Sequence, residues 1–289
     1  MTAASAPSAD RLRSYRRGEL VFDVVDTGPL DGETVVLLHG FPAAAESWNA
    51  VAEGLNRAGY RTLAPDQRGY SAGARPRRAD AYRIDELVGD VIALADHAGV
   101  PRFHVIGHDW GGLVAWHLAA RYQLRVQTLV ALSTPHPRAL AESLTCSAQL
   151  LRSSYALAWQ LPVVPELALT ARRGALLRVG LRWSGLPDGP TLAYTQRMLE
   201  PGALTAALGW YRAAARHPAE LLDIADVTTP TLYLWSSNDP ALGRTAAERT
   251  ARHVVGPYGF EVLVGVSHWI PETAPDTVVE AFLDSRPSR

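Results

Sequence analysis

The sequence predicts an α/β protein with a mostly parallel sheet, helices on both faces of that sheet and one inserted helical segment. Short apolar runs alternate with amphipathic runs over residues 20–132, as strands alternate with helices in such folds. The alternation then stops, and helical patterns broken by prolines follow until strand character returns. We therefore expect residues 1–134 and 228–289 to form one α/β core, and residues 135–227 to form a helical insertion.

Strands are predicted where short runs of β-branched and apolar residues occur, and helices where apolar residues recur at helical spacing, as at Ile84, Leu87 and Val91. The first 17 residues are polar and are predicted to be a tail. The predicted strands cover residues 20–25, 34–38, 62–65, 103–106, 127–132, 231–235 and 260–264. The predicted helices outside the insertion cover residues 47–58, 84–98, 111–122 and 277–283.

The composition excludes several classes of function. All 28 basic residues are Arg, so Schiff-base, pyridoxal-phosphate and phosphate-loop lysines are excluded. The net charge of −1 gives no indication of nucleic acid or an acidic membrane as a partner. Cys146 is the single cysteine, which excludes an intrachain disulfide. Because no apolar leader and no run long enough to cross a bilayer occur, we expect a soluble, cytoplasmic protein without a membrane span.

The most informative motif is residues 107–112, with the sequence GHDWGG, between a predicted strand and a predicted helix. The chain must turn a tight corner here, and the glycines leave room for it because a Cβ would collide with neighbouring backbone. Asp109, at the tip, is expected to present its side chain above the end of the strand. A carboxylate is ionised at neutral pH and attacks without prior loss of a proton, so Asp109 is predicted to be a nucleophile that forms an ester.

A loop after another predicted strand supplies a candidate oxyanion hole. Functional groups in open α/β sheets collect at the carboxyl ends of strands. The strand at residues 34–38 is followed by the sequence HGFP. We expect the backbone N–H of Phe41 to point at the site and to form an oxyanion hole with the N–H of Trp110.

The last two strands are followed by an acid and a histidine. Asp239 comes after the strand at residues 231–235, and His268 after the strand at residues 260–264. The order nucleophile, acid, histidine is that of the α/β-hydrolase fold, which is therefore the predicted fold. We expect Asp239 to orient the imidazole of His268, and His268 to activate the water that cleaves the ester on Asp109.

Other titratable residues have structural interpretations. His39 and His108 belong to the motifs but are expected to shape them. Asp223 and Asp226 precede the strand whose end carries the acid, so they would lie at its wrong end. Asp66 ends a strand, but the sequence that follows it is typical of an ion-paired loop. The alternative for the elbow itself is a decayed, non-catalytic turn.

Together these motifs resemble the cap-containing epoxide hydrolases of the α/β-hydrolase superfamily. The resemblance runs from about Leu20 to the C-terminus, is strong in the core and is weaker in the insertion. It implies that the insertion is a cap, or lid, over the site. The segments that carry it are residues 39–42, 66–71, 107–112, 133–137 and 267–271.

The resemblance also implies two cap tyrosines that donate hydrogen bonds to the epoxide oxygen. Tyr155 lies in the sequence YALAWQLP, similar to one stretch of the family, and Tyr211 lies in GWYR, similar to another in which Asn precedes Trp. The opened ring is an alkoxide, which two phenol O–H groups can stabilise and protonate. Tyr194, also in the insertion, is the alternative to Tyr155 as the first of the two.

The resulting hypothesis is an epoxide hydrolase that converts a small hydrophobic epoxide and water to a vicinal diol. Asp109 forms a hydroxyalkyl ester and His268 activates the water that cleaves it. We expect no metal and no organic cofactor, because no His/Cys/Asp cluster has metal-ligand spacing. The sequence leaves the physiological epoxide, the stereoselectivity and the oligomeric state open, and a homodimer is compatible with it.

Two alternatives use the same residues differently. A haloalkane or haloacid dehalogenase forms the same kind of ester, and Trp110 could then hold a halide. Haloalkane dehalogenases usually place Asn or Trp where this chain has Phe41, and fluoroacetate-type enzymes place Arg where it has Trp110. A non-catalytic ligand-binding protein of the same fold is the second alternative. Trp159, Trp183 and Trp269 are further candidates for the pocket wall, after Phe41 and Trp110.

Overall fold

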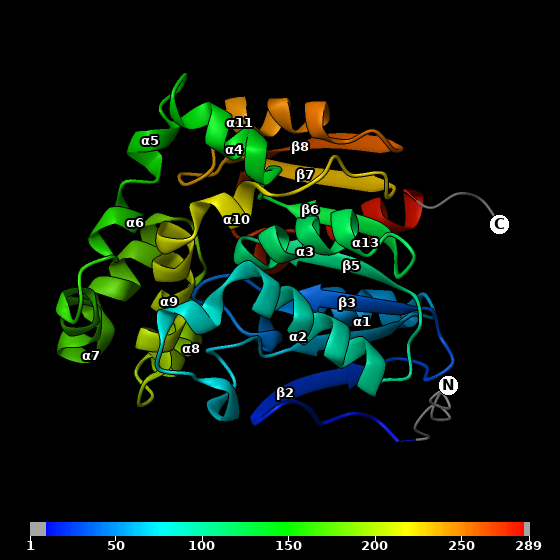
Figure 1. The fold of residues 1–289 in the computed structure, drawn as a ribbon, viewed down its shortest axis with the longest axis horizontal. Helices are drawn as coiled ribbons and strands as arrows, with labels where there is room; N and C mark the ends of the chain where they lie inside the picture. Colours follow the sequence, from blue (N-terminus) through cyan, green and yellow to red (C-terminus); the bar gives the residue numbers. More distant parts are fainter. Residues whose placement is uncertain (1–9, 286–289) are drawn as a thin grey trace.

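The computed structural model describes residues 10–285, whose strands form one eight-stranded sheet (Figure 1). The strands are β1 (Ser14–Arg17), β2 (Leu20–Thr27), β3 (Thr34–Leu38), β4 (Arg61–Pro65), β5 (Phe103–His108), β6 (Val126–Leu132), β7 (Thr231–Asn238) and β8 (Tyr258–Ser267). Their order across the sheet is β1-β2-β4-β3-β5-β6-β7-β8. The pairs β1–β2 and β2–β4 are antiparallel, and the pairs from β4–β3 to β7–β8 are parallel.

The helices fall into two groups. The core helices are α1 (Asn49–Arg57), α2 (Ile84–His97), α3 (Trp110–Arg121), α11 (Arg244–Arg249), α12 (Ile270–Thr273) and α13 (Pro275–Asp284), with short 3-10 turns η1 (Ala45–Trp48), η2 (Ala72–Ala74), η3 (Ala79–Tyr82) and η4 (Thr250–His253). The insertion between β6 and β7 contains α4 (Pro137–Leu144), α5 (Gln149–Arg152), α6 (Tyr155–Ala158), α7 (Val164–Trp183), α8 (Asp188–Met198), α9 (Ala203–Arg216) and α10 (Pro218–Leu222). Among the described residues, none of the helices is long and apolar enough to cross a membrane.

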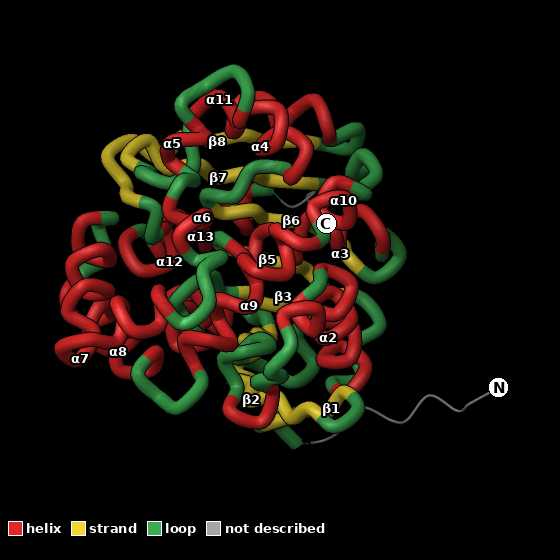
Figure 2. Tube along the Cα trace, turned by 60° about the vertical axis from the view of Figure 1, so that its left-hand side comes forward, coloured by secondary structure: helices red, strands yellow, loops and turns green. Residues whose placement is uncertain are grey.

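The sheet is covered on both faces, and β3 shows why. Its residues are buried throughout, and successive side chains point to opposite faces. Val36 and Leu38 belong to the core shared with α2 and α3, whereas Val35 and Leu37 belong to the core shared with α1 and α13. Figure 2 shows the strands stacked between helices. The predicted α/β architecture is therefore confirmed.

The N-terminal edge of the sheet corrects one expectation. Residues 14–17, predicted to be the end of a polar tail, form strand β1, which pairs with β2. Tyr15 stacks on Phe22 with ring centroids 4.8 Å apart, and Arg17 forms ion pairs with Glu86 and Asp90. The polar pattern is that of an edge strand, where charged side chains face solvent and only one residue needs to be buried. Residues 1–9 of the predicted tail lie outside the described residues.

The seven predicted strands and four predicted core helices are all present, with ends that agree or differ by at most three residues. The largest extensions occur in β7 and β8. Both strands continue toward the residues predicted to act at their carboxyl ends, and β7 ends at Asn238, directly before Asp239. The helices α5 to α9 of the insertion gather beyond one end of the strands (Figure 1).

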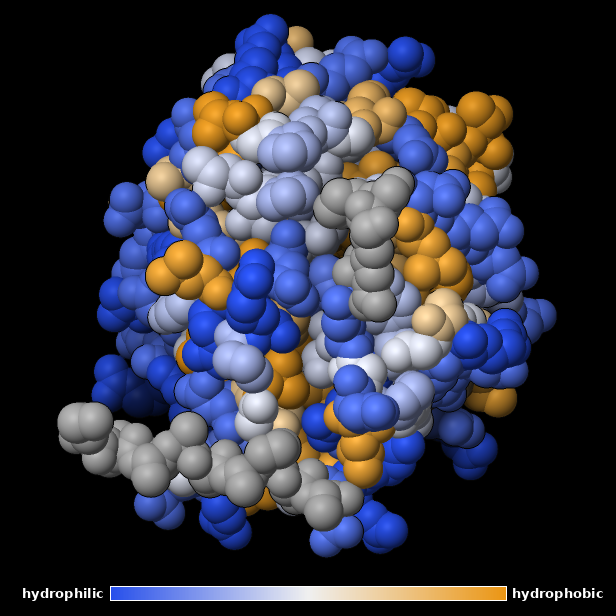
Figure 3. All heavy atoms as spheres, turned by 90° about the vertical axis from the view of Figure 1, so that its right-hand side faces the viewer, coloured by the Kyte–Doolittle hydropathy of each residue, from blue (hydrophilic) through white to orange (hydrophobic). Residues whose placement is uncertain are grey.

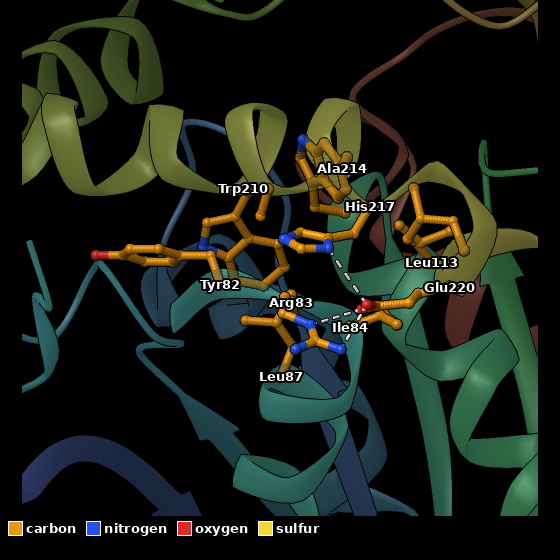
Figure 4. Close-up of a pocket in the computed structure, with 12 residues that line it drawn as sticks. Tyr82, Arg83, Ile84, Leu87, Leu113, Trp210, Ala214, His217 and Glu220 are labelled. Atoms are coloured by element: carbon orange, nitrogen blue, oxygen red, sulfur yellow. Dashed lines mark hydrogen bonds and ion pairs between the residues drawn. The ribbon is translucent and has the colours of Figure 1, made fainter. Parts of the chain in front are cut away.

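The chain returns from the insertion to the core through a charged junction. Figure 4 shows Arg83 and His217 directed at the carboxylate of Glu220, with Tyr82 and Trp210 beside them. The space enclosed here is about 10 Å³, no more than a single water needs. This junction therefore fastens α9 and α10 to the core rather than forming a ligand site.

Candidate active site

The turn at residues 107–112 is a strained corner between β5 and α3. Asp109 has φ 52° and ψ −122°, a backbone conformation that is rare for a residue with a side chain. A Cβ on Gly111 would meet the backbone of Leu38, and a Cβ on Gly40 would meet the Asp109 side chain. The corner therefore needs glycine at both positions, and it presents Asp109 against the loop that follows β3.

The two oxygens of the Asp109 carboxylate have different surroundings. Oδ1 accepts a hydrogen bond of 2.8 Å from the backbone N–H of Phe41. Oδ2 lies 3.7 Å from Nε2 of His268, beyond a direct hydrogen bond. Burial raises the pKa of Asp109, but the charge of His268 and the N–H groups of Phe41 and Trp110 oppose that rise. One oxygen is thus held by a backbone donor and the other is free to react.

His268 is held from one side by Asp239. Its Nδ1 lies 2.7 Å from Asp239 Oδ2, and the second oxygen of that carboxylate accepts the N–H groups of Ala241 and Leu242, each at 2.8 Å. Burial alone would lower the pKa of His268, but the charges of Asp239 and Asp109 and the hydrogen bond to Asp239 raise that pKa to about 9. The Nε2 atom is left on the side of Asp109.

The main chain of His268 is held from the other side by two buried donors. Its carbonyl oxygen accepts a hydrogen bond from Ser133 Oγ at 2.9 Å and lies 2.8 Å from Nε2 of His108. Burial and the nearby charge of His268 hold the pKa of His108 well below its usual value, so its ring is neutral. A carbonyl only accepts hydrogen bonds, and therefore the proton of His108 is on Nε2. The sequence assigned His108 a shaping role and placed Ser133 in a segment that resembles the family, but it gave Ser133 no role.

The residue after Ser133 holds the main chain of Asp109 in the same way. Thr134 Oγ1 donates a hydrogen bond of 2.8 Å to the carbonyl oxygen of Asp109, and the Thr134 carbonyl accepts from Trp116 Nε1 at 3.0 Å. Ser133 has φ 61°, and its carbonyl accepts the hydroxyl of Tyr233 at 2.8 Å. Two adjacent hydroxyl residues that follow β6 therefore fix the main chains of Asp109 and His268.

A cavity of about 590 Å³ lies above these groups and between them and the insertion. Its wall is mostly apolar, which suits a hydrophobic ligand. The core contributes Phe41, Pro42, Asp109, Pro240, Ala241, His268 and Trp269, and the insertion contributes Leu151, Arg152, Ser154, Tyr155, Trp159, Leu169, Leu176, Leu177, Gly180, Leu181, Trp183, Ser184 and Tyr211.

Both tyrosines expected from the family resemblance line this cavity. Tyr211, on α9, is buried, and Tyr155, at the start of α6, is 40% exposed. Trp159 packs between them, with its ring centroid 4.7 Å from that of Tyr155 and 4.4 Å from that of Tyr211. Removal of water from both hydroxyls and the nearby charge of Asp109 raise the pKa of each tyrosine, so both remain protonated hydrogen-bond donors at neutral pH.

Tyr194 is engaged elsewhere. It is buried and does not line the cavity; its hydroxyl donates a hydrogen bond of 2.7 Å to Oε1 of Glu272. Burial raises the pKa of Glu272 to about 7, partly opposed by that hydrogen bond and by the charge of His268. Of the two candidates for the first cap tyrosine, Tyr155 is therefore the one that faces Asp109 across the cavity.

The aromatic candidates for the pocket wall differ from the expectation in one respect. Phe41, Trp159, Trp183 and Trp269 line the cavity. The indole of Trp110 does not, because it packs against the insertion, with its centroid 4.8 Å from that of Tyr211. The sequence could not separate these tryptophans because the packing of the insertion determines which of them reach the cavity.

The competing residues have structural partners. Nε2 of His39 lies 3.2 Å from the backbone nitrogen of Gln67. Asp66 accepts a hydrogen bond of 2.9 Å from the N–H of Ala45 and forms an ion pair with Arg197 of α8. These contacts agree with the motif-shaping role expected for His39 and the loop-stabilising role expected for Asp66. Over residues 10–285, the structure contains no group of three or more His, Cys, Asp and Glu that could hold a metal ion.

Comparisons with known proteins agree with this geometry. A family model described as the alpha/beta hydrolase fold matches residues 33–275. The chain is 38% identical to the AB hydrolase superfamily protein YfhM of Bacillus subtilis, over 92% of this chain and 94% of that protein. It is 32% identical to epoxide hydrolase A of Mycobacterium tuberculosis, over 90% of this chain and 92% of that protein.

Solved structures give the same result. The crystal structure of epoxide hydrolase A from Mycobacterium thermoresistibile matches with a TM-score of 0.80 and 31% identity, over 94% of this chain and 97% of that one. A structure described among novel epoxide hydrolases in metagenomes from hot environments matches with a TM-score of 0.85 and 28% identity, over 97% of this chain and 99% of that one. The two epoxide hydrolases named A exceed 30% identity over at least 90% of both chains, and the family model covers most of this one, so the chain belongs to the epoxide hydrolases of the α/β-hydrolase fold family.

Proposed function

We propose that this protein opens an epoxide to a vicinal diol in two steps, through an ester on Asp109. In the first step, Oδ2 of Asp109 attacks an epoxide carbon, and the bond between that carbon and the epoxide oxygen breaks. The oxygen leaves as an alkoxide, which hydrogen bonds from Tyr155 and Tyr211 stabilise and which takes a proton from one of them. The product of this step is a hydroxyalkyl ester and a tyrosinate.

In the second step, water cleaves the ester. His268 takes a proton from the water, whose oxygen attacks Cγ of Asp109, and the N–H groups of Phe41 and Trp110 stabilise the negative charge on Oδ1. The bond between Cγ and the alkyl oxygen breaks, and the protonated His268 gives its proton to the departing alkoxide. The carboxylic acid formed on Asp109 loses its proton to the tyrosinate, which restores the enzyme. The diol carries the former Oδ2, and the water oxygen stays on Asp109.

The observation that carries this proposal is the asymmetry of the Asp109 carboxylate. Its Oδ1 accepts the N–H of Phe41, and its Oδ2 faces His268 at 3.7 Å. Two protonated phenols on the opposite wall of the same cavity supply the acid that ring opening requires. These contacts also support the proposal that the insertion is a cap, because it contributes both phenols.

A dehalogenase is less well supported by the same contacts. A halide leaving group needs N–H donors directed into the cavity. The indole of Trp110 instead packs against Trp210 and is hydrogen-bonded to the hydroxyl of Tyr211, so its N–H is already engaged, and Phe41 offers no side-chain donor. A non-catalytic receptor would not need Asp239 and His268 aligned behind the nucleophile, with Nδ1 and Oδ2 2.7 Å apart.

The cavity supports a hydrophobic epoxide as the substrate. Its apolar wall and volume of about 590 Å³ fall in the range of sites that enclose a drug-sized ligand. We further propose a cytoplasmic location, which the exposed free thiol of Cys146 supports because such a thiol persists in a reducing compartment.

A substrate panel tests the proposal. Wild type and Asp109→Ala are offered styrene oxide and a series of bromoalkanes, and diol and bromide are measured. We expect diol formation by the wild type, no bromide release, and no turnover by the variant. Bromide release without diol would favour the dehalogenase, and epoxide binding without turnover would favour the receptor.

A single turnover in ¹⁸O-water tests the ester. With enzyme in excess over epoxide, the label is expected in the peptide that contains Asp109 and not in the first diol formed. Label in the diol after one turnover would mean that water attacks the epoxide directly, which would contradict the covalent mechanism.

A further inference from the structure

The second half of α7 carries an apolar stripe that no other part of the described chain covers. The helix is interrupted at residues 171–174, which have non-helical backbone angles, and a straight segment follows. Leu177 and Leu181 face the interior, whereas Leu176, Val179 and Trp183 are 55%, 61% and 77% exposed. The spacing i, i+3, i+7 places these three side chains along one line of the helix. An exposed apolar line on a helix that already has a buried face indicates a surface for docking.

Arginines border this stripe. On the polar side of the helix, Arg178 directly precedes Val179 and Arg182 directly precedes Trp183. Two further arginines, Arg172 and Arg173, are exposed at the interruption where this second half of α7 begins. Residues 143–188 contain five Arg and two acidic residues: Glu166, which is bound by Arg212, and Asp188, which forms an ion pair with Arg182. The whole chain has a net charge of −1, so positive charge is concentrated here. The net charge of the whole chain does not reveal this local excess of arginine.

The stripe is continuous with the active-site cavity. Leu176 and Trp183 line the cavity and are also exposed to solvent, as is Leu151 on α5. A hydrophobic molecule on the outer surface of α7 would therefore meet an apolar route into the site. The face at the right of Figure 1, seen directly in Figure 3, is different: hydrophobic side chains are scattered there among hydrophilic ones.

We propose that this surface, formed by Leu176, Val179 and Trp183 with Arg178 and Arg182, docks on an anionic lipid surface. Leu and Trp on one line and Arg beside it are what a helix needs to lie in a bilayer interface, with its apolar side chains among the acyl chains and its arginines at the headgroups. A second copy of this chain would bring the same positive charge against itself, which opposes a symmetric dimer. The positive charge of the arginines beside the stripe therefore favours an anionic partner.

Vesicle sedimentation tests this docking. The full-length protein is mixed with vesicles of phosphatidylcholine alone and of phosphatidylcholine with phosphatidylglycerol, at low and high salt. We expect binding to the anionic vesicles only, and we expect it to weaken with salt because the charges are exposed. Arg178→Gln should weaken binding about fivefold, the effect of one cation at an anionic surface. Val179→Asp should weaken it by at least about tenfold, because an apolar contact is replaced by a like charge.

Leu124→Asp is the matched control. Leu124 is 88% exposed, in the loop between α3 and β6, far from α7 in the chain. We expect this variant to bind vesicles as the wild type does. Val179 does not line the cavity, so Val179→Asp should turn over dissolved styrene oxide at the wild-type rate. Equal loss of vesicle binding in Leu124→Asp and Val179→Asp, or equal binding to neutral and anionic vesicles, would overturn the proposal.

The remaining outcomes are also decisive. Light scattering across a concentration series reports whether the protein forms dimers that Val179→Asp dissolves, and such dimers without vesicle binding would assign the surface to a second copy. Sedimentation measures binding and not turnover, so a failure of the proposed function leaves this result intact. The inference rests on the proposed function at one point: the lipid is taken to supply the hydrophobic epoxide that the enzyme hydrolyses.

Discussion

Ser133 and His268 are joined by a hydrogen bond of 2.9 Å from the serine hydroxyl to the histidine carbonyl. The contact links the end of β6 to the loop after β8, and the next residue, Thr134, makes the equivalent contact with Asp109 at 2.8 Å. A single dipeptide thus ties together the main chains of Asp109 and His268. We expect the 3.7 Å between Asp109 Oδ2 and His268 Nε2 to depend on it.

Ser133→Ala should slow cleavage of the ester more than its formation, because the freed carbonyl lets His268 move. The loss of one buried hydrogen bond corresponds to about 1 kcal/mol, or roughly fivefold in rate. Stopped-flow fluorescence with excess enzyme separates the two steps. Ser47→Ala removes a comparable buried hydroxyl bond of 2.8 Å, to the carbonyl of Ala44, which is not among the contacts of the His268 main chain. An equal effect of both variants on ester cleavage would contradict the positioning role.

Thr134→Val should slow ester formation, since it removes the hydroxyl that holds the carbonyl of Asp109 but keeps the side-chain shape. We also expect a loss of about 1 kcal/mol in unfolding free energy, measured by urea denaturation. Thr134→Ser keeps the hydroxyl and should restore most of the rate. If serine and valine behave alike, the hydrogen bond is not what positions Asp109.

His268→Gln should trap the ester. Without a base the second step is expected to slow by about 10²–10⁴-fold, whereas attack by Asp109 requires no base. Mass spectrometry of the variant after incubation with styrene oxide should show the protein heavier by one epoxide, with the mass on the peptide that contains Asp109. Asp109→Asn is the control and should stay unmodified. An unmodified His268→Gln protein would indicate that the histidine acts before the ester forms.

Tyr155→Phe and Tyr211→Phe should each lower the rate of ring opening, by about 10²-fold for the loss of one donor to the developing alkoxide. The double variant should be inactive. Tyr194→Phe is the matched control: its hydroxyl binds Glu272 and does not line the cavity. It should therefore change stability but not the single-turnover rate. A larger loss of rate in Tyr194→Phe than in Tyr155→Phe would reverse the assignment of the first cap tyrosine.

The pKa of His268, about 9, should fall when the charge of Asp109 is removed. Asp109→Asn imitates the ester in this respect, so the pKa of His268 should be lower once the ester has formed and water must be activated. NMR titration of the imidazole in wild type and variant measures the difference. Since the folded-state pKa lies above the usual 6.5, the protonated ring stabilises the fold fully below pH 6.5, and that contribution is lost as pH rises through about 9. An unchanged pKa in Asp109→Asn would contradict this coupling.

Local patterns accounted for much of the fold. The apolar runs and helical spacing predicted the strands and core helices, because burial on two faces of a parallel sheet imposes those patterns on short segments. Strand β1 was missed because a charged edge strand with one buried residue carries almost no such pattern. For the site, the strand ends indicated Asp109, Asp239, His268 and Phe41, because parallel strands bring their carboxyl ends to one edge.

The sequence by itself therefore determined the architecture and the identity of the groups proposed to react, since both follow from motifs a few residues long. Only the tertiary structure decided that Tyr155 rather than Tyr194 faces Asp109, that the indole of Trp110 lies outside the cavity, and that Ser133 and Thr134 hold the reacting residues. These relationships join segments distant in the chain. They depend on how the insertion packs over the core and on which buried donor finds which carbonyl, and no local pattern contains that information.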